Sequence, residues 1–263
     1  EKWHALPAGH DPSTGKQKKA AAAANPAYTA VFGKGLTELA QQDTSVVAIT
    51  AAMPAGTGTA VFAAAIPDRF FDVGIAEGHA VTFAAGLATR GIKPVVAIYS
   101  TFLQRAYDNV IHDVALQQLP VVFCMDRAGL VGEDGPTHMG LYDIAYMLAV
   151  PGMVVTAPKD GAEMLALLRT GLAHTEGPLC LRYPRDASPD VPKAATEIPA
   201  VPFGTWEVLR QGRDLAILAV GTMVLPALAA AESLAGDGID PTVVNCRCLE
   251  AFDEVTLSAM MGQ

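Results

Sequence analysis

The sequence has 263 residues, of which 51% are hydrophobic and 17% charged, and its formal net charge is −9. An acidic balance argues against a nucleic-acid partner, and no apolar run reaches the roughly 18 residues of a membrane span. The apolar share is large enough to build a sizeable buried core. Three of the four cysteines sit inside apolar runs, so we expect reduced thiols, no disulfide framework and a cytoplasmic location.

The chain begins with a segment that does not resemble a folded element. Residues 1–27 are polar and then Ala-rich, with Pro7, Pro12 and Pro26, which is typical of a linker or a disordered lead-in. Over residues 28–187, apolar runs alternate regularly with helical stretches. The helical stretches cover about 29–41, 77–91, 101–119, 141–150 and 159–174, and the runs that indicate strands cover 46–50, 70–76, 93–100, 120–126, 153–157 and 178–184. Continuous Val/Ile runs of this kind predict a doubly wound α/β domain with a mostly parallel sheet.

A Pro-rich linker, residues 188–202, leads to a second unit over 203–263. Its pattern is a strand over 214–222, a helix over 223–236 and a strand over 241–247. These elements amount to about half of an ordinary α/β domain, so we expect a truncated second domain.

Polar side chains follow four of the predicted strands at the point where each strand ends. In doubly wound sheets, ligands bind outside the carboxyl ends of the strands, so these side chains are expected to meet at one site. The candidates are Glu77 after the second strand, Tyr99, Phe102 and Arg105 after the third, Arg127, Asp134 and His138 after the fourth, and Arg185 after the sixth.

Two of these residues suit the binding of an aminopyrimidine. Glu77 begins a predicted helix, where an acid is favoured by the helix dipole alone. It also lies in an apolar run, where a carboxyl group can share a proton with a ligand nitrogen. The helix after Phe102 has its own apolar stripe, which leaves the Phe102 ring to offer a stacking face, although a lone aromatic is more often part of a core.

The remaining candidates suit proton transfer and anion binding. His138 and Asp134 lie in a loop shaped by glycines and a proline. A single loop histidine is more often simply solvated, but with Asp134 four residues away His138 is a reasonable proton-transfer group. Arg127 and Arg185 match the oxygens of a phosphate group, but an ion pair with the adjacent Asp126 or Asp186 is an equally ordinary role.

Two segments are specific enough to indicate a family. YSTFLQRAYDNVIHDVA (99–115) and DRAGLVGEDGPTHMG (126–140) resemble the 1-deoxy-D-xylulose-5-phosphate synthases, which are transketolase-like thiamin-diphosphate enzymes. The resemblance is strong over about 28–187 and weaker to the end. It separates the chain from transketolases proper and from the β chains of 2-oxoacid dehydrogenases. The family usually has Gln where this chain has Gly78.

The resemblance implies a reaction and a role for each candidate. Members of the family condense pyruvate with D-glyceraldehyde 3-phosphate, release CO2 and form 1-deoxy-D-xylulose 5-phosphate, the first step of the methylerythritol-phosphate isoprenoid pathway. By its place in the motifs, Glu77 contacts the aminopyrimidine and Phe102 stacks on it. Tyr99, Arg105, Asp134 and His138 then line the reacting centre, and Arg127 and Arg185 hold the acceptor's phosphate.

The resemblance also implies partners outside these residues. The ligands of the diphosphate and of Mg²⁺ belong to the family's N-terminal domain, which this sequence lacks, so no metal ligand is expected in this segment and the segment alone is expected to be inactive. A homodimer is expected. Two alternatives stay open, a C-terminal subunit of another transketolase-type enzyme and a non-catalytic dimerisation module.

Overall fold

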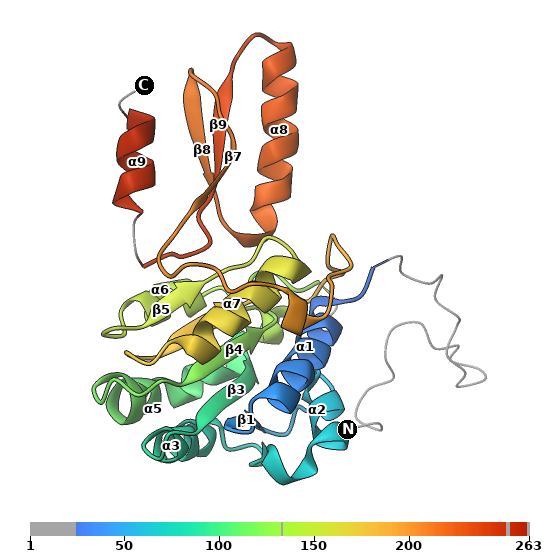
Figure 1. Ribbon diagram of the computed structural model, residues 1–263, viewed down its shortest axis with the longest axis vertical. Helices are drawn as coiled ribbons and strands as arrows, with labels where there is room; N and C mark the ends of the chain where they lie inside the picture. The colour runs from blue at the N-terminus through green and yellow to red at the C-terminus, as the bar shows by residue number, and fades with distance from the viewer. Residues whose placement is uncertain (1–24, 133, 251–252, 262–263) are drawn as a thin grey trace, which may run out of the picture.

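The computed structural model describes residues 25–132, 134–250 and 253–261 (Figure 1). The lead-in expected over 1–27 falls, up to residue 24, outside the described residues. The first unit is built on a six-stranded sheet of order β2-β1-β3-β4-β6-β5, in which every neighbouring pair is parallel. This confirms the predicted doubly wound parallel sheet. The strands are β1 (Val46–Thr50), β2 (Phe70–Asp72), β3 (Lys93–Tyr99), β4 (Val122–Asp126), β5 (Val154–Thr156) and β6 (Leu179–Arg182).

Helices cover both faces of this sheet, which explains why its strands are continuous Val/Ile/Leu runs. On one face, α1 (Tyr28–Gln42), α2 (Thr59–Ala65) and α7 (Gly161–Ala173) enclose one buried apolar cluster. On the other face, a second cluster is enclosed by α3 (Glu77–Ala88), α4 (Ser100–Leu103), α5 (Tyr107–Asn109) and α6 (Asp143–Leu148). Short 3-10 turns connect these elements: η1 (Pro67–Arg69), η2 (Gln104–Ala106), η4 (Pro136–His138), η5 (Ala195–Glu197) and η6 (Gly221–Met223).

The second strand is shorter than predicted. It ends at Asp72 rather than at residue 76, because the Asp72 carboxylate accepts hydrogen bonds from the backbone N–H groups of Ala52 and Gly74, at 2.7 and 3.0 Å. Gly74 has a φ of +72°, a left-handed conformation that a strand cannot continue through. The chain therefore turns between β2 and α3, and Glu77 becomes the first residue of α3.

The helix predicted over 101–119 is not continuous. It is divided into α4, η2, α5 and a π-helix, η3 (Val110–Ala115). At the junction, the Asn109 amide donates to Thr82 of α3 and to Asp113, both at 3.1 Å. This contact with a neighbouring helix accounts for the distortion, which no periodicity in the sequence indicates.

The second unit stands above the first in Figure 1. Its three-stranded sheet has the order β7-β9-β8, with β8 and β9 parallel and β7 antiparallel to β9. The sequence predicted β8 (Leu215–Ala219), α8 (Val224–Gly236) and β9 (Pro241–Asn245), but missed β7 (Glu207–Arg210) and α9 (Glu254–Met261). The small sheet with α8 packed against it confirms a second α/β unit. Among the described residues, no helix has both the length and the apolar character needed to cross a bilayer.

Charged and amide side chains join the two units. Lys159 lies between Glu163 of the first unit and Glu207 of the second, at 3.3 and 3.0 Å. The buried Asn245 donates to Glu163 at 2.7 Å, and Arg247 approaches the same carboxylate at 3.4 Å. Backbone hydrogen bonds between residues 155–157 and 247–249 reinforce the contact.

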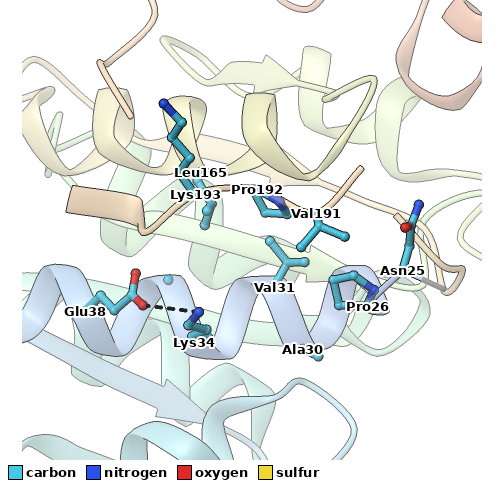
Figure 2. Close-up of a pocket in the computed structure, with 11 residues that line it drawn as sticks. Asn25, Pro26, Ala30, Val31, Lys34, Glu38, Leu165, Val191, Pro192 and Lys193 are labelled. Atoms are coloured by element: carbon cyan, nitrogen blue, oxygen red, sulfur yellow. Dashed lines mark ion pairs between the residues drawn. The ribbon is translucent and has the colours of Figure 1, made fainter. Parts of the chain in front are cut away.

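A groove of about 390 Å³ separates α1 from the linker that follows the first unit (Figure 2). Val31 and Leu165 give it an apolar wall, and Lys34 and Glu38 form an ion pair at its edge at 3.7 Å. None of the site residues predicted from the sequence lines this groove.

Gly33→Ala is expected to lower the free energy of unfolding by roughly 1–3 kcal/mol, because it overpacks the contact between α1 and α2. A Cβ at Gly33 would lie 2.2 Å from the carbonyl oxygen of Gly58, which is backbone and cannot rotate away. Gly86→Ala on α3 is the matched control, since nothing lies within 4 Å of its Cβ position. There, alanine is expected to stabilise the helix by about 0.5–1 kcal/mol. Urea unfolding measures both, and equal midpoints for the two variants would contradict the packing argument.

Candidate active site

All eight candidate residues lie at the carboxyl edge of the large sheet. β3 ends at Tyr99 and β4 at Asp126, and these two residues pair in register. The segments that follow the strands converge there, as expected for parallel neighbours. Six of the eight line two cavities, which we call the Glu77 cavity and the Arg185 cavity. Asp134 and His138 line neither, but they contact residues that do.

The Glu77 cavity has a volume of about 510 Å³. The side chain of Glu77 is only 3% exposed and lies at the start of α3, where the helix dipole favours a negative charge. Arg105 Nη1 lies 3.5 Å from its Oε2 atom. The cavity therefore combines one buried carboxyl group with a mostly apolar wall. It is lined by Ala51, Ala52, Met53, Ile75, Glu77, Tyr99, Phe102 and Arg105.

Aromatic rings form one side of this cavity. The rings of Tyr99 and Phe102 stack at 5.6 Å between centroids, with an interplanar angle of 18°. The rings of His138 and Phe102 form an edge-to-face pair, with 5.2 Å between centroids. Thr101 donates to the carbonyl oxygen of Thr137 at 3.2 Å, which fixes the loop that carries His138 against α4. In this arrangement Phe102 already stacks on Tyr99, and its stacking on a bound ring remains a prediction.

Tyr99 separates the two cavities. On the side of the Arg185 cavity, the Arg127 guanidinium carbon lies 3.7 Å from the centroid of the Tyr99 ring, a cation–π contact. Burial raises the pKa of Tyr99 to about 12, although the nearby Arg127 charge acts to lower it. Any side chain at Gly56 would collide with the tyrosine hydroxyl, since a Cβ there would lie 1.6 Å from it.

The Arg185 cavity, of about 380 Å³, contains the two arginines. Arg127 donates to Asp134 at 2.9 Å, to Asp126 at 3.0 Å and to the carbonyl oxygen of Gly56 at 2.7 Å. Arg185 forms an ion pair with Asp134, so this carboxylate bridges both arginines. The ion pair between Arg127 and Asp126, the ordinary role considered for that arginine, is therefore present, while the guanidinium still lines the cavity.

Asp126 is a site residue that the sequence did not single out. It is fully buried, and its carboxylate accepts from Thr29 at 2.7 Å as well as from Arg127. Burial raises its pKa to about 6, and the hydrogen bonds and the Arg127 charge only partly offset this. In the sequence analysis, Asp126 was considered only as a possible ion-pair partner of Arg127.

The segment after β1 was also missed. Met53 and Gly56 lie there. The Tyr99 backbone N–H donates to the Met53 sulfur, with an N–S distance of 3.4 Å, and the Tyr99 hydroxyl lies close to Gly56. Its position could have indicated it, because this segment follows the end of a strand, as do the segments in which the candidate residues were found. Gly78, the departure from the family pattern, faces Asn109, and a Cβ there would lie 2.8 Å from the Asn109 Oδ1 atom.

Family models match almost the whole described chain. Residues 24–190 match the transketolase pyrimidine-binding domain, and residues 204–263 match the transketolase C-terminal domain. The fold is a doubly wound α/β domain, with a buried carboxyl group and stacked aromatic rings at the carboxyl edge of its parallel sheet. The chain belongs to the transketolase family, as a pyrimidine-binding domain followed by C-terminal-domain sequence.

Within that family, curated relatives similar to the chain include 1-deoxy-D-xylulose-5-phosphate synthases. The chain is 60% identical to that of Thermomicrobium roseum over 228 residues, which is 87% of this chain and 36% of the relative. It is 56% identical to that of Gloeobacter violaceus over 252 residues, which is 96% of this chain and 39% of the relative. The chain thus spans somewhat more than a third of the length of these relatives.

Solved structures share the fold. A split-gene transketolase, described as an inactive β4 tetramer, has a TM-score of 0.80 at 33% identity, covering 90% of this chain and 77% of that one. A transketolase from Pichia stipitis has a TM-score of 0.76 at 21% identity, covering 92% of this chain and 37% of that one. At that identity the second likeness concerns the fold alone.

Proposed function

We propose that this chain is the pyrimidine-binding part of a thiamin-diphosphate-dependent transferase. The enzyme condenses pyruvate with D-glyceraldehyde 3-phosphate, with loss of CO2, to 1-deoxy-D-xylulose 5-phosphate, the first step of the methylerythritol-phosphate isoprenoid pathway. The observation that carries the proposal is the Glu77 cavity, which joins a buried carboxyl group to stacked aromatic rings. The names of the curated relatives support the choice of reaction.

The residues of the Glu77 cavity fit an aminopyrimidine ring. Glu77 is the buried polar group, with room beside it, and Met53 and Ile75 supply apolar surface for a flat heterocycle. When bound, thiamin diphosphate supplies a nucleophilic carbon that forms and breaks bonds to carbonyl groups. The task of Glu77 is to hold a proton at a ring nitrogen, and Phe102 is placed to fix the plane of the ring.

The other candidates are assigned to the substrates. His138 packs beside Phe102 and is positioned to move a proton at the acceptor's carbonyl oxygen. Tyr99 and Arg105 line the same cavity and orient the pyruvate, while Asp134 orients the two arginines by accepting from both. Arg127 and Arg185 bind the phosphate of glyceraldehyde 3-phosphate in the adjacent cavity.

The rest of the enzyme is proposed from the relatives. We propose that the ligands for Mg²⁺ and for the diphosphate lie in the part of the longer protein that corresponds to the unmatched length of the relatives. We infer a cytoplasmic homodimer. Four free, buried thiols, Cys124, Cys180, Cys246 and Cys248, support a reducing compartment.

Product analysis of the longer protein that contains this chain tests the reaction. With pyruvate, glyceraldehyde 3-phosphate, thiamin diphosphate and Mg²⁺, it is expected to form 1-deoxy-D-xylulose 5-phosphate and CO2 in equal amounts. Transfer of a two-carbon unit from a ketose phosphate, with no use of pyruvate, would favour the transketolase-type alternative. Failure to bind thiamin diphosphate at all would favour a non-catalytic dimerisation module.

Arg185→Ala and Arg127→Ala are expected to lower kcat/KM for glyceraldehyde 3-phosphate by about one to two orders of magnitude. The reason is that each removes a charge-assisted contact worth roughly 1.5–3 kcal/mol. Steady-state kinetics with unphosphorylated glyceraldehyde are the control, because that acceptor never uses the arginines. If the arginines serve only as ion-pair partners, both aldehydes lose activity in equal proportion and the melting temperature falls.

A further inference from the structure

Among the described residues, the Arg185 cavity already holds at least as many carboxylates as arginines before any anion binds, since the exposed Asp186 also lines it. The two arginines are matched by Asp126 and Asp134 in one connected cluster. A phosphate dianion placed there would leave the cluster with excess negative charge. The Asp134 side chain is 22% exposed, so water screens part of its charge, whereas Asp126 is fully buried. Asp126 is therefore the carboxylate whose charge is most costly to keep once an anion arrives.

The surroundings of Asp126 allow it to hold a proton. Its Oδ2 atom lies 2.7 Å from the Thr29 hydroxyl, which donates to the carboxylate but can equally accept from a carboxylic acid. The Tyr183 hydroxyl is buried, has no hydrogen-bond partner among the described residues, and lies close enough to Asp126 to feel its charge. Charged and titratable groups from four segments face Asp126 or its cavity. They are Tyr99 at the end of β3, Arg127 directly after β4, Asp134 in the loop that follows, and Tyr183, Arg185 and Asp186 after β6.

We propose that Asp126 takes up a proton when a phosphate monoester binds to Arg127 and Arg185, so that the cavity accepts the anion without accumulating negative charge. The inference rests on the proposed function for the location of the phosphate. A solvent proton joins a carboxylate oxygen of Asp126, and no bond of the ligand forms or breaks. A phosphate bound to Arg127 would share that guanidinium with Asp126, which accepts from it at 3.0 Å. A nearby like charge favours the neutral carboxyl.

The sign of the proton change distinguishes proton uptake by Asp126 from proton release by the ligand. With a pKa of about 6, Asp126 is about nine-tenths ionised at pH 7 and has almost a whole proton to gain. A phosphate monoester, whose second pKa is about 6, is already mostly dianionic at pH 7 and can release only about a tenth of a proton. Uptake by the protein and release by the ligand therefore differ in sign and in size.

Calorimetric titration measures this proton change directly. The longer, cofactor-loaded enzyme is titrated at pH 7 with glyceraldehyde 3-phosphate, without pyruvate, in two buffers of different ionisation enthalpy. We expect the uptake of roughly half a proton or more per phosphate bound. In Asp126→Asn the uptake is expected to disappear while binding persists. Asp186→Asn, which removes an exposed carboxylate lining the same cavity, is expected to keep it.

The Asp126→Asn variant is expected to fold. Because burial raises the pKa of Asp126, its ionised form costs stability, a cost that is absent at low pH and grows as pH rises through about 6. The isosteric amide removes that cost, so a melting temperature at pH 8 no lower than that of the wild type is expected. Thr29→Val is a second variant. It removes the hydrogen bond that favours the ionised carboxylate, and the uptake at pH 7 is expected to fall for that reason.

The outcomes distinguish this inference from the proposed function. Equal uptake in the wild type and Asp126→Asn, or no uptake in the wild type, would overturn the role of Asp126 even if the phosphate binds as proposed. If neither Arg127→Ala nor Arg185→Ala weakens binding, the proposed phosphate site itself would be contradicted.

Discussion

Glu77→Gln is expected to lower turnover of the longer enzyme by about two to four orders of magnitude while leaving its fold nearly unchanged. Glutamine has almost the same shape and can still accept from Arg105, which lies 3.5 Å from the carboxylate. It cannot share a proton with a ring nitrogen, so only the activation of the cofactor is lost. Turnover, the melting temperature and the rate of proton exchange at the cofactor's reactive carbon are the three measurements.

Two comparisons make this test specific. Glu232→Gln, on the exposed face of α8, changes the net charge by the same amount and is expected to leave turnover unchanged. Proton exchange in Glu77→Gln at the wild-type rate would mean that Glu77 is only a favourable charge at the start of α3.

Phe32→Ala is expected to lower the free energy of unfolding by about 3–5 kcal/mol. The Phe32 side chain on α1 is fully buried, and its ring lies 5.4 Å from that of Tyr183, so alanine leaves a cavity that the sheet cannot collapse to fill. Urea unfolding of the chain measures the loss. Val61→Ala on α2, where the side chain is 50% exposed, is the control and is expected to cost less than about 0.5 kcal/mol.

A cost below about 1 kcal/mol for Phe32→Ala would show that the α1 face is not packed as described. The site is expected to respond as well, since Tyr183 lies close enough to Asp126 to feel its charge. Phe32→Leu retains most of the volume and is expected to lose much less stability.

The sequence predicted the fold best where one physical signal dominates. The strands at Val46–Thr50, Lys93–Tyr99 and Val122–Asp126 were found because strands buried on both faces must be continuously apolar. Errors occurred where a tertiary contact decides the local structure. The Asp72 carboxylate ends β2 early, and Asn109 interrupts the predicted helix by bonding to another element.

The same distinction applies to the candidate site. The position of strand ends brought Glu77, Phe102 and Arg127 to one edge of the sheet, because that edge is a property of topology. The sharing of Asp134 between the two arginines depends on how a loop folds back, and the burial of Asp126 depends on α1, which is far away in sequence. Neither leaves a periodic signal. The roles of these residues in binding a cofactor and a phosphate stay predictions.

An experimental structure of the longer enzyme with thiamin diphosphate bound tests the central claim most directly. The account predicts that the aminopyrimidine occupies the Glu77 cavity, with the Glu77 carboxyl within hydrogen-bond distance, about 2.6–3.2 Å, of a ring nitrogen and with Phe102 against the ring face. A cofactor bound elsewhere, with Glu77 still paired to Arg105 alone, would contradict it.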